Sequence, residues 1–133
     1  MPNNHWKLWK AGLRNDTKKG TREMNLEQLN DDRVEKALVY LASTDEDHAG
    51  LGSEVKRLEE GVKQAKAHSF LVAEGTVAER EAKAVASLKY ANAIELWTEA
   101  YRDFKILDNK RNTEIRITEL WQTLSSNRRK GTI

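Results

Sequence analysis

The side chains whose types could catalyse reactions or bind metals are spaced in ways that favour structural roles. His48 lies beside Asp45 and Asp47, which are metal-ligand types, but a helix does not place these three on one face with a fourth ligand. His68 is a single histidine in a charged stretch, where packing or surface exposure is the common role. The sequence therefore predicts no metal site, no cofactor and no catalytic histidine.

Carboxylates that could act as general acids or bases occur in pairs, but lysines accompany them on what should be helix surface. The carboxylates are Glu59, Glu60, Glu79 and Glu81, and the lysines are Lys63, Lys66 and Lys83. The sequence has no cysteine, and it contains no Gly-rich phosphate loop and no nucleophile elbow. These patterns favour solvated ion pairs over an active site, and we predict that the protein is not an enzyme.

Cations and a tryptophan gather toward the carboxyl end of the chain. Lys and Arg side chains meet phosphates, and an aromatic ring can stack on a base, so this group predicts a nucleic-acid or partner surface. Its members are Arg111, Arg116, Trp121, Arg128, Arg129 and Lys130. The alternative interpretation is a helix terminus that attracts cations because of the helix dipole.

The net charge of +2 is unevenly distributed along the chain. Residues 1–23 carry six Lys or Arg against two acids, residues 24–101 carry nine against fifteen, and residues 102–133 carry eight against four. Basic ends on an acidic body can bind an anionic partner. The alternative that we favour is self-neutralisation, in which the basic carboxyl end lies near Asp45, Glu46 and Asp47.

Length and composition favour one all-α domain. The chain has 133 residues, of which 33% are charged, with one proline, and this profile is typical of long solvated helices. No apolar stretch reaches the roughly 18 residues that a membrane span requires, and no signal peptide is recognisable. We therefore expect a cytoplasmic protein that does not bind membranes.

Three helices are expected before the last long one. Asn25 or Asn30 caps the first, which should end near Ala42, and Ser43 to Asp45 should cap the second. The second helix carries a heptad-spaced seam of Leu51, Val55, Leu58, Val62, Ala65, Ser69 and Val72. Gly75 and Thr76 predict a turn, followed by a short helix over 77–86.

The last helix is predicted to begin after a Ser87 cap and to run from Leu88 to Ser126. Its seam should consist of Tyr90, Ile94, Trp97, Tyr101 and Phe104, and should resume at Ile115, Leu120, Trp121 and Leu124. Between them, the polar residues 108–114 predict a register drift or a surface that faces solvent or a partner. The expected fold is a long antiparallel, coiled-coil-like helical hairpin with one or two short additional helices. Because the last helix is so long, we expect self-association.

Residues 1–23 have neither helical nor strand periodicity. One hypothesis is that they precede the true start of the protein at Met24, because Lys18, Lys19 and Gly20 can be encoded by purine-rich codons like those of a ribosome-binding site. The alternative is a basic arm in which Trp6 and Trp9 stack on bases. Residues 24–133 would then form a single helical domain.

Three segments resemble a family of small, uncharacterised helical proteins encoded by tailed bacteriophages and prophages. They are AEGTVAEREAKA (73–84), LDNKRNTEIRI (107–117) and WQTLSSNRRKG (121–131), and the resemblance covers about residues 24–133. It implies an accessory role in phage DNA metabolism or host takeover, in the cytoplasm of a bacterial host. We therefore expect a helical protein that binds a phage or host protein. The alternative is direct, non-specific binding of single-stranded DNA through the basic carboxyl end.

Overall fold

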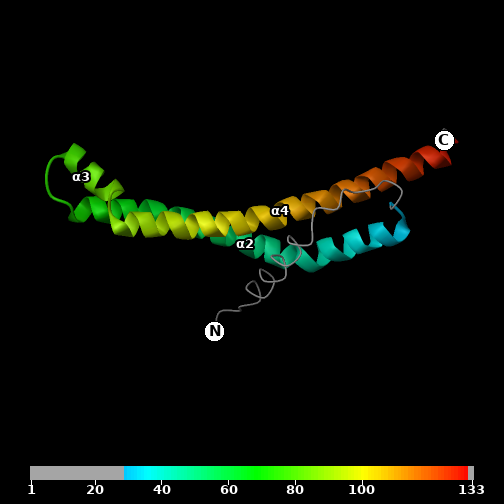
Figure 1. The fold of residues 1–133 in the computed structure, drawn as a ribbon, viewed down its shortest axis with the longest axis horizontal. Helices are drawn as coiled ribbons and strands as arrows, with labels where there is room; N and C mark the ends of the chain where they lie inside the picture. Colours follow the sequence, from blue (N-terminus) through cyan, green and yellow to red (C-terminus); the bar gives the residue numbers. More distant parts are fainter. Residues whose placement is uncertain (1–28, 132–133) are drawn as a thin grey trace. The chain divides into compact units, whose positions relative to one another are not determined.

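The computed structural model describes residues 29–131, and its regular structure in that range is entirely helical. Helix α2 spans Asp31–Val72, α3 spans Val77–Val85 and α4 spans Leu88–Arg129 (Figure 1). The long helices α2 and α4 run antiparallel, which confirms the predicted all-α hairpin with a short additional helix. The N-terminal segment 1–23, with the proposed start at Met24, lies outside the described residues.

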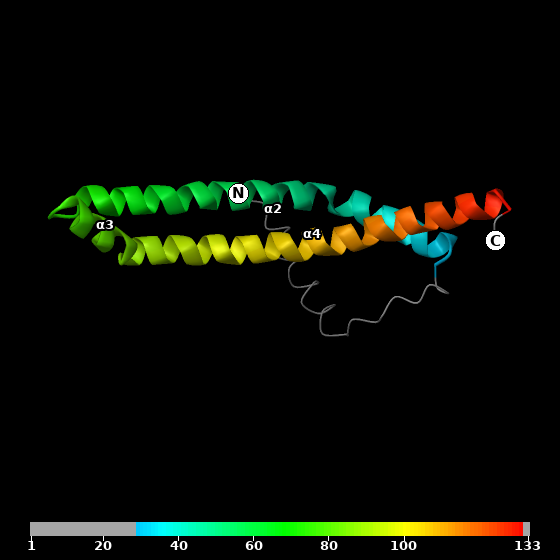
Figure 2. The same ribbon diagram turned by 90° about the horizontal axis from the view of Figure 1, so that it is seen from above.

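Contacts divide the chain into two compact units, which are described separately. Unit 1 contains α2 up to Asp47 and α4 from Asp108, and unit 2 is His48–Leu107. Within each unit α2 and α4 lie side by side in both views (Figures 1 and 2). That residues 24–133 form one domain stays a prediction.

Side-chain caps begin each of the three described helices. The Asn30 Oδ1 accepts a hydrogen bond from the backbone N–H of Arg33 at 2.9 Å. The Thr76 hydroxyl accepts one from the backbone N–H of Glu79 at 3.2 Å, and Ser87 caps α4 in the same way. Each bond satisfies a donor that the first turn of a helix leaves unpaired. The predicted caps at these three positions are confirmed.

The predicted break between Ala42 and Asp45 is wrong, because α2 continues through it. The hydroxyls of Ser43 and Thr44 both donate to the backbone carbonyl of Tyr40 at 2.9 Å. They therefore bond back onto the preceding turn of the same helix and do not cap a new one. Thr44 is also buried, so packing on α4 opposes a break at this point.

The inward seam of α2 alternates in steps of three and four residues along the whole helix. Its members are Val34, Ala37, Leu41, Thr44, His48, Leu51, Val55, Leu58, Val62, Ala65 and Ser69, all buried or half-buried. The predicted seam from Leu51 to Ser69 is thus confirmed. Val72 is 68% exposed, because α2 ends there and nothing in the described chain covers it.

The inward seam of α4 in unit 2 differs from the predicted one. Ala93 and Ala100 are half-buried, whereas Ile94 and Tyr101 are exposed. Alanines thus take the inward positions on either side of Trp97, because sequence hydrophobicity does not reveal which side of a wide apolar stripe meets the partner helix.

In unit 1 the α4 seam includes one residue that sequence patterning overlooked. Ile117 is fully buried, while the predicted Ile115 is 37% exposed and Leu120, Trp121 and Leu124 are half-buried. The same helix continues without interruption through the polar residues 108–114. In the range 29–131, no helix is long and apolar enough to cross a membrane.

Candidate functional site

A polar cluster joins α2 and α4 in unit 1 and is centred on Arg111. Its guanidinium donates to the Leu41 carbonyl at 2.8 Å, to the Thr44 hydroxyl at 2.6 Å and to the Asp45 carboxylate at 2.6 Å. The side chain of Arg111 is only 12% exposed. Arg111 therefore points toward α2, and the prediction that the interval 108–114 faces solvent or a partner is wrong at this residue. The alternative, a drift in register, stays a prediction.

A second ion pair in unit 1 joins Arg33 of α2 to Glu114 of α4. The two guanidinium nitrogens donate to the two carboxylate oxygens at 2.8 and 2.9 Å, in the bidentate geometry that arginine favours. The hydrogen bonds from Arg33 to Glu114 raise the pKa of the Arg33 guanidinium above its usual value. Both members of this pair are therefore engaged within the hairpin.

The expectation that the basic carboxyl end lies near the acidic residues 45–47 is confirmed at Arg111, which belongs to the basic stretch 102–133. It is wrong for the last cations, residues 128–130. Asp45 is paired with Arg111, and the indole N–H of Trp121 donates to the Asp31 carboxylate at 3.1 Å. Trp121 therefore lies beside the first residue of α2. Because Arg129 follows eight residues later at a rise of 1.5 Å per residue, the end of α4 extends about 12 Å beyond that contact.

Four of the six predicted binding residues remain on the surface. They are Arg116, Arg128, Arg129 and Lys130, all exposed and without an ion pair inside residues 29–131. We call these four residues the basic end. Arg111 and Trp121, by contrast, contact α2. The structure thus separates the predicted group into two residues that hold the hairpin together and four that are available to a ligand.

Sequence patterning overlooked a group of exposed aliphatic side chains in unit 2, where α2, α3 and α4 meet. Its members are Leu71 (72% exposed), Val72 (68%), Val77 (68%), Val85 (50%) and Leu88 (76%). We call these five residues the α3 corner. The sequence could have indicated this group, because apolar residues flank the predicted turn and the predicted short helix. Several exposed aliphatic side chains near one another are typical of binding surfaces.

Helix α3 is attached to the hairpin by few contacts. Ala84 is fully buried, and the Arg80 guanidinium donates to the Phe70 carbonyl at 3.2 and 3.3 Å while lying 4.3 Å from the centre of the Phe70 ring. The hydroxyl of Ser87 donates to that of Ser69 at 3.1 Å. Since α3 turns Ala84 and Arg80 inward, Val77 and Val85 remain exposed to solvent.

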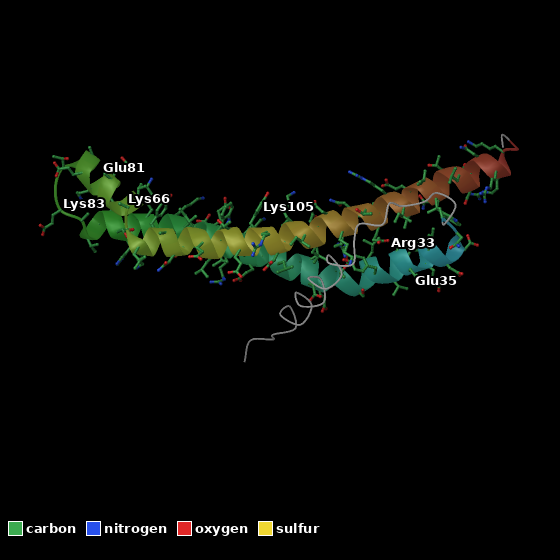
Figure 3. The ribbon with its side chains drawn as sticks, in the orientation of Figure 1. Arg33, Glu35, Lys66, Glu81, Lys83 and Lys105 are labelled. Atoms are coloured by element: carbon green, nitrogen blue, oxygen red, sulfur yellow. The ribbon has the colours of Figure 1, made fainter. Side chains whose placement is uncertain are left out.

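Two lysines beside the α3 corner are engaged within unit 2. Lys83 donates to the Glu74 carbonyl at 2.7 Å, and Lys66 of α2 forms an ion pair of 3.8 Å with Glu81 of α3. Figure 3 shows Lys66, Glu81 and Lys83 where these helices meet. A third lysine, Lys89, follows Leu88 and is exposed without an ion pair inside the described chain. The corner is therefore a mainly aliphatic surface with one such lysine at its edge.

The remaining chemical candidates are placed separately along the helices. The ring of His48 stacks on Phe104 with centroids 5.2 Å apart, Lys63 pairs with Glu60 at 3.2 Å, and His68 is exposed. Within residues 29–131, no group of three or more His, Asp or Glu side chains is arranged to hold a metal ion.

Comparisons of the chain with protein-family models, with curated proteins and with solved structures found no match. The two candidate surfaces, the α3 corner and the basic end, are therefore compared by their own chemistry. The first is mainly aliphatic, whereas the second is cationic, and its cations have no ion pair within the described chain.

Proposed function

We propose that this protein is a non-enzymatic helical accessory protein that acts by binding another protein through the α3 corner. The observation that carries the proposal is the exposure of Val77 and Val85 on a helix that buries only Ala84 completely. Burying an aliphatic side chain on a partner gains about 1.5 to 3 kcal/mol relative to leaving it in water. Five such residues at one corner supply enough apolar area for a docking site.

The chemistry of the corner indicates what the partner surface is like. Lys66 and Lys83 are engaged with Glu81 and the Glu74 carbonyl. Lys89, next to Leu88, is exposed and has no ion pair inside the described chain, so the five aliphatic side chains outnumber the one lysine that could meet a phosphate or an acidic peptide. We therefore propose an apolar, weakly charged groove on a phage or bacterial host protein as its occupant. The resemblance of segments 73–84, 107–117 and 121–131 to phage-encoded helical proteins supports this setting, in phage DNA metabolism or host takeover.

The test is nuclease-treated affinity capture from infected bacterial cells with matched variants. Val77→Gln combined with Val85→Gln makes the corner polar without adding charge, and Val39→Gln makes the same change at a 62% exposed valine in unit 1. We expect the parent and the Val39→Gln variant to retain a protein that the double variant loses. Calorimetric titration with that purified protein must then reproduce the difference. Equal binding by all three forms would contradict the proposal.

A second candidate function is direct, non-specific binding of single-stranded DNA by the basic end. Its supporting observation is that Arg116, Arg128, Arg129 and Lys130 are exposed and have no ion pair inside the described chain. Clustered cations bind phosphates with strong salt dependence but without sequence specificity. This function would be independent of the α3 corner.

Fluorescence anisotropy with a labelled single-stranded oligonucleotide tests this second function. Changing Arg128, Arg129 and Lys130 together to glutamate should abolish binding at low salt. The matched control changes Lys56, Lys89 and Lys105 to glutamate, because these exposed lysines of unit 2 give the same change in net charge. If the parent protein does not bind DNA at low salt, or if both triple variants lose binding equally, the basic end is not a DNA site.

A further inference from the structure

Helix α4 presents a wider apolar face in unit 2 than α2 covers. Trp97, Ala100 and Phe104 lie half-buried against α2, whereas Ile94 and Tyr101 are 37% and 41% exposed. Ile94 lies three residues before Trp97, and Tyr101 lies four residues after it. Because these spacings keep side chains on neighbouring parts of a helix surface, Ile94 and Tyr101 form a second apolar line beside the seam. A face of this width is typical of a helix with two neighbours, because a single partner covers only the narrower seam.

Helix α2 packs on one apolar line of α4 and leaves the second exposed. A Cβ added to Gly52 would meet the Phe104 ring at 3.4 Å, so this ring packs on α2 at Gly52. The ring of His48, also on α2, stacks on Phe104 with centroids 5.2 Å apart. These contacts place the line of Trp97 and Phe104 against α2, and Ile94 and Tyr101 remain exposed.

The exposed aromatic side chain is held in a fixed position. The Tyr101 ring stacks on Trp97 with ring centroids 5.3 Å apart and an interplanar angle of 21°. The indole N–H of Trp97 is buried and has no hydrogen-bond partner within the described residues. A tyrosine held by a neighbouring ring loses little conformational entropy on binding, which favours its use as an anchor in an interface.

Charges beside this line are arranged so that a copy of α4 complements itself. Glu95 precedes Thr98, whereas Arg102 and Lys105 follow it, and all four residues are exposed. Within residues 29–131, Glu95, Arg102 and Lys105 form no ion pair, unlike Lys66, which pairs with Glu81. If two α4 helices pack antiparallel about a two-fold axis near Thr98, Glu95 of each copy faces Arg102 of the other.

We propose that a second copy of this chain covers the α4 face formed by Ile94, Thr98 and Tyr101, with the two α4 helices antiparallel. Ile94 of each copy then packs near Tyr101 of the other, because both lie three or four residues from the axis at Thr98. The resulting assembly is a four-helix arrangement in unit 2, which supplies the second neighbour that α4 lacks. This interface uses the side of α4 next to Trp97 and leaves the α3 corner available for a different partner.

Sedimentation velocity on the full chain tests the interface. The parent should be a dimer, and Ile94→Gln combined with Tyr101→Gln should raise its dissociation constant roughly tenfold or more, since anchors of this kind dominate interface energies. The matched control is Leu96→Gln, which changes a 56% exposed leucine on the same helix but outside the proposed face. A monomeric parent at high concentration, or equal dissociation of both variants, would overturn the proposal.

Charge reversal adds a test that does not depend on apolar packing. Arg102→Glu should weaken the dimer, because it opposes Glu95 of the second copy, and adding Glu95→Lys to the same chain should restore it. A structural role for Arg102 inside one chain would not produce this rescue. If the double reversal sediments like Arg102→Glu alone, the antiparallel pairing is wrong.

A cysteine cross-link identifies the occupant directly, because the chain contains no cysteine of its own. Thr98→Cys lies near the proposed axis and should form a disulfide-linked dimer under mild oxidation, since that bond requires Cβ atoms about 3.5 to 4.5 Å apart. Ser53→Cys, which is exposed on α2, should not. Equal cross-linking at both positions would contradict the proposal.

Val77→Gln with Val85→Gln should leave the dimer intact, so failure of this interface and failure of the proposed function give different results.

Discussion

The guanidinium of Arg111 donates a 2.6 Å hydrogen bond to the hydroxyl of Thr44, a buried residue that occupies a seam position of α2. Thr44 in turn donates to the Tyr40 carbonyl at 2.9 Å, so its hydroxyl is fully used between the two helices. A polar contact at this depth replaces the apolar pair that heptad spacing would otherwise place there. It thereby selects the register in which α2 and α4 pair in unit 1.

The first prediction is that Arg111→Ala destabilises the protein by about 1.5 to 3 kcal/mol, the usual range for hydrogen bonds to charged groups. A double-mutant cycle that combines Arg111→Ala with Thr44→Val should show a coupling energy of about 0.5 kcal/mol or more, because a hydrogen bond joins the two side chains. Urea unfolding followed by circular dichroism measures both values. The control Arg116→Ala, at an exposed cation one turn further, should change stability by less than about 0.5 kcal/mol. Equal effects at Arg111 and Arg116 would contradict the structural role of Arg111.

A second prediction concerns two glycines for which alanine should have opposite effects. Gly75 has a φ of 120°, and an added Cβ would collide with the Glu79 side chain, so Gly75→Ala should destabilise by about 1 to 2 kcal/mol. Gly50 is inside α2, and an added Cβ would meet nothing within 4 Å. Gly50→Ala should therefore stabilise by up to about 1 kcal/mol through helix propensity. Thermal unfolding of the two variants measures this difference, and shifts of the same sign would be inconsistent with these backbone conformations.

The third prediction tests the core of unit 2. Leu107 is fully buried, and Leu107→Ala should cost about 2 to 5 kcal/mol because it removes apolar contacts and leaves a cavity. Leu96→Ala makes the same chemical change at a side chain that is 56% exposed, and should cost much less. Denaturant unfolding gives both free energies. A small effect at Leu107 would mean that α2 and α4 do not pack there as described.

The fourth prediction concerns acid pH. Hydrogen bonds from Arg57 hold the pKa of the Glu54 carboxyl below its usual value, with Oε1 of Glu54 2.5 Å from the guanidinium. A lowered folded-state pKa means that this pair stabilises the protein above the unfolded pKa and ceases to do so as the pH falls through the folded value. Because both side chains are largely exposed, the contribution should be small. The melting temperature of Glu54→Gln should therefore lie slightly below the parent at pH 7 and meet it at strongly acidic pH. A difference independent of pH would exclude this ion pair as its cause.

Local sequence signals determined the helices and most of their ends. Asn30, Thr76 and Ser87 were predicted as caps because short polar side chains satisfy backbone donors of their own first turn, and the structure confirms each bond. The turn at Gly75 followed from the same kind of local reasoning, since only glycine adopts a φ of 120° without strain. These features depend on residues a few positions apart, so they can be predicted without the tertiary fold.

Only the tertiary structure decided which face of each helix is covered and which cations are free. Ser43 and Thr44 have the composition of a cap, but packing of Thr44 on Arg111, 67 residues away, favours one continuous helix. For the same reason Arg111 contacts α2, while Arg116 on the same helix stays exposed. Ile94 and Tyr101 have the periodicity of a core, yet α2 packs on the neighbouring line of α4, where Gly52 meets Phe104, and leaves them exposed. Each outcome depends on the register between two helices, which is set by pairs of residues that are distant in sequence and therefore absent from any local pattern.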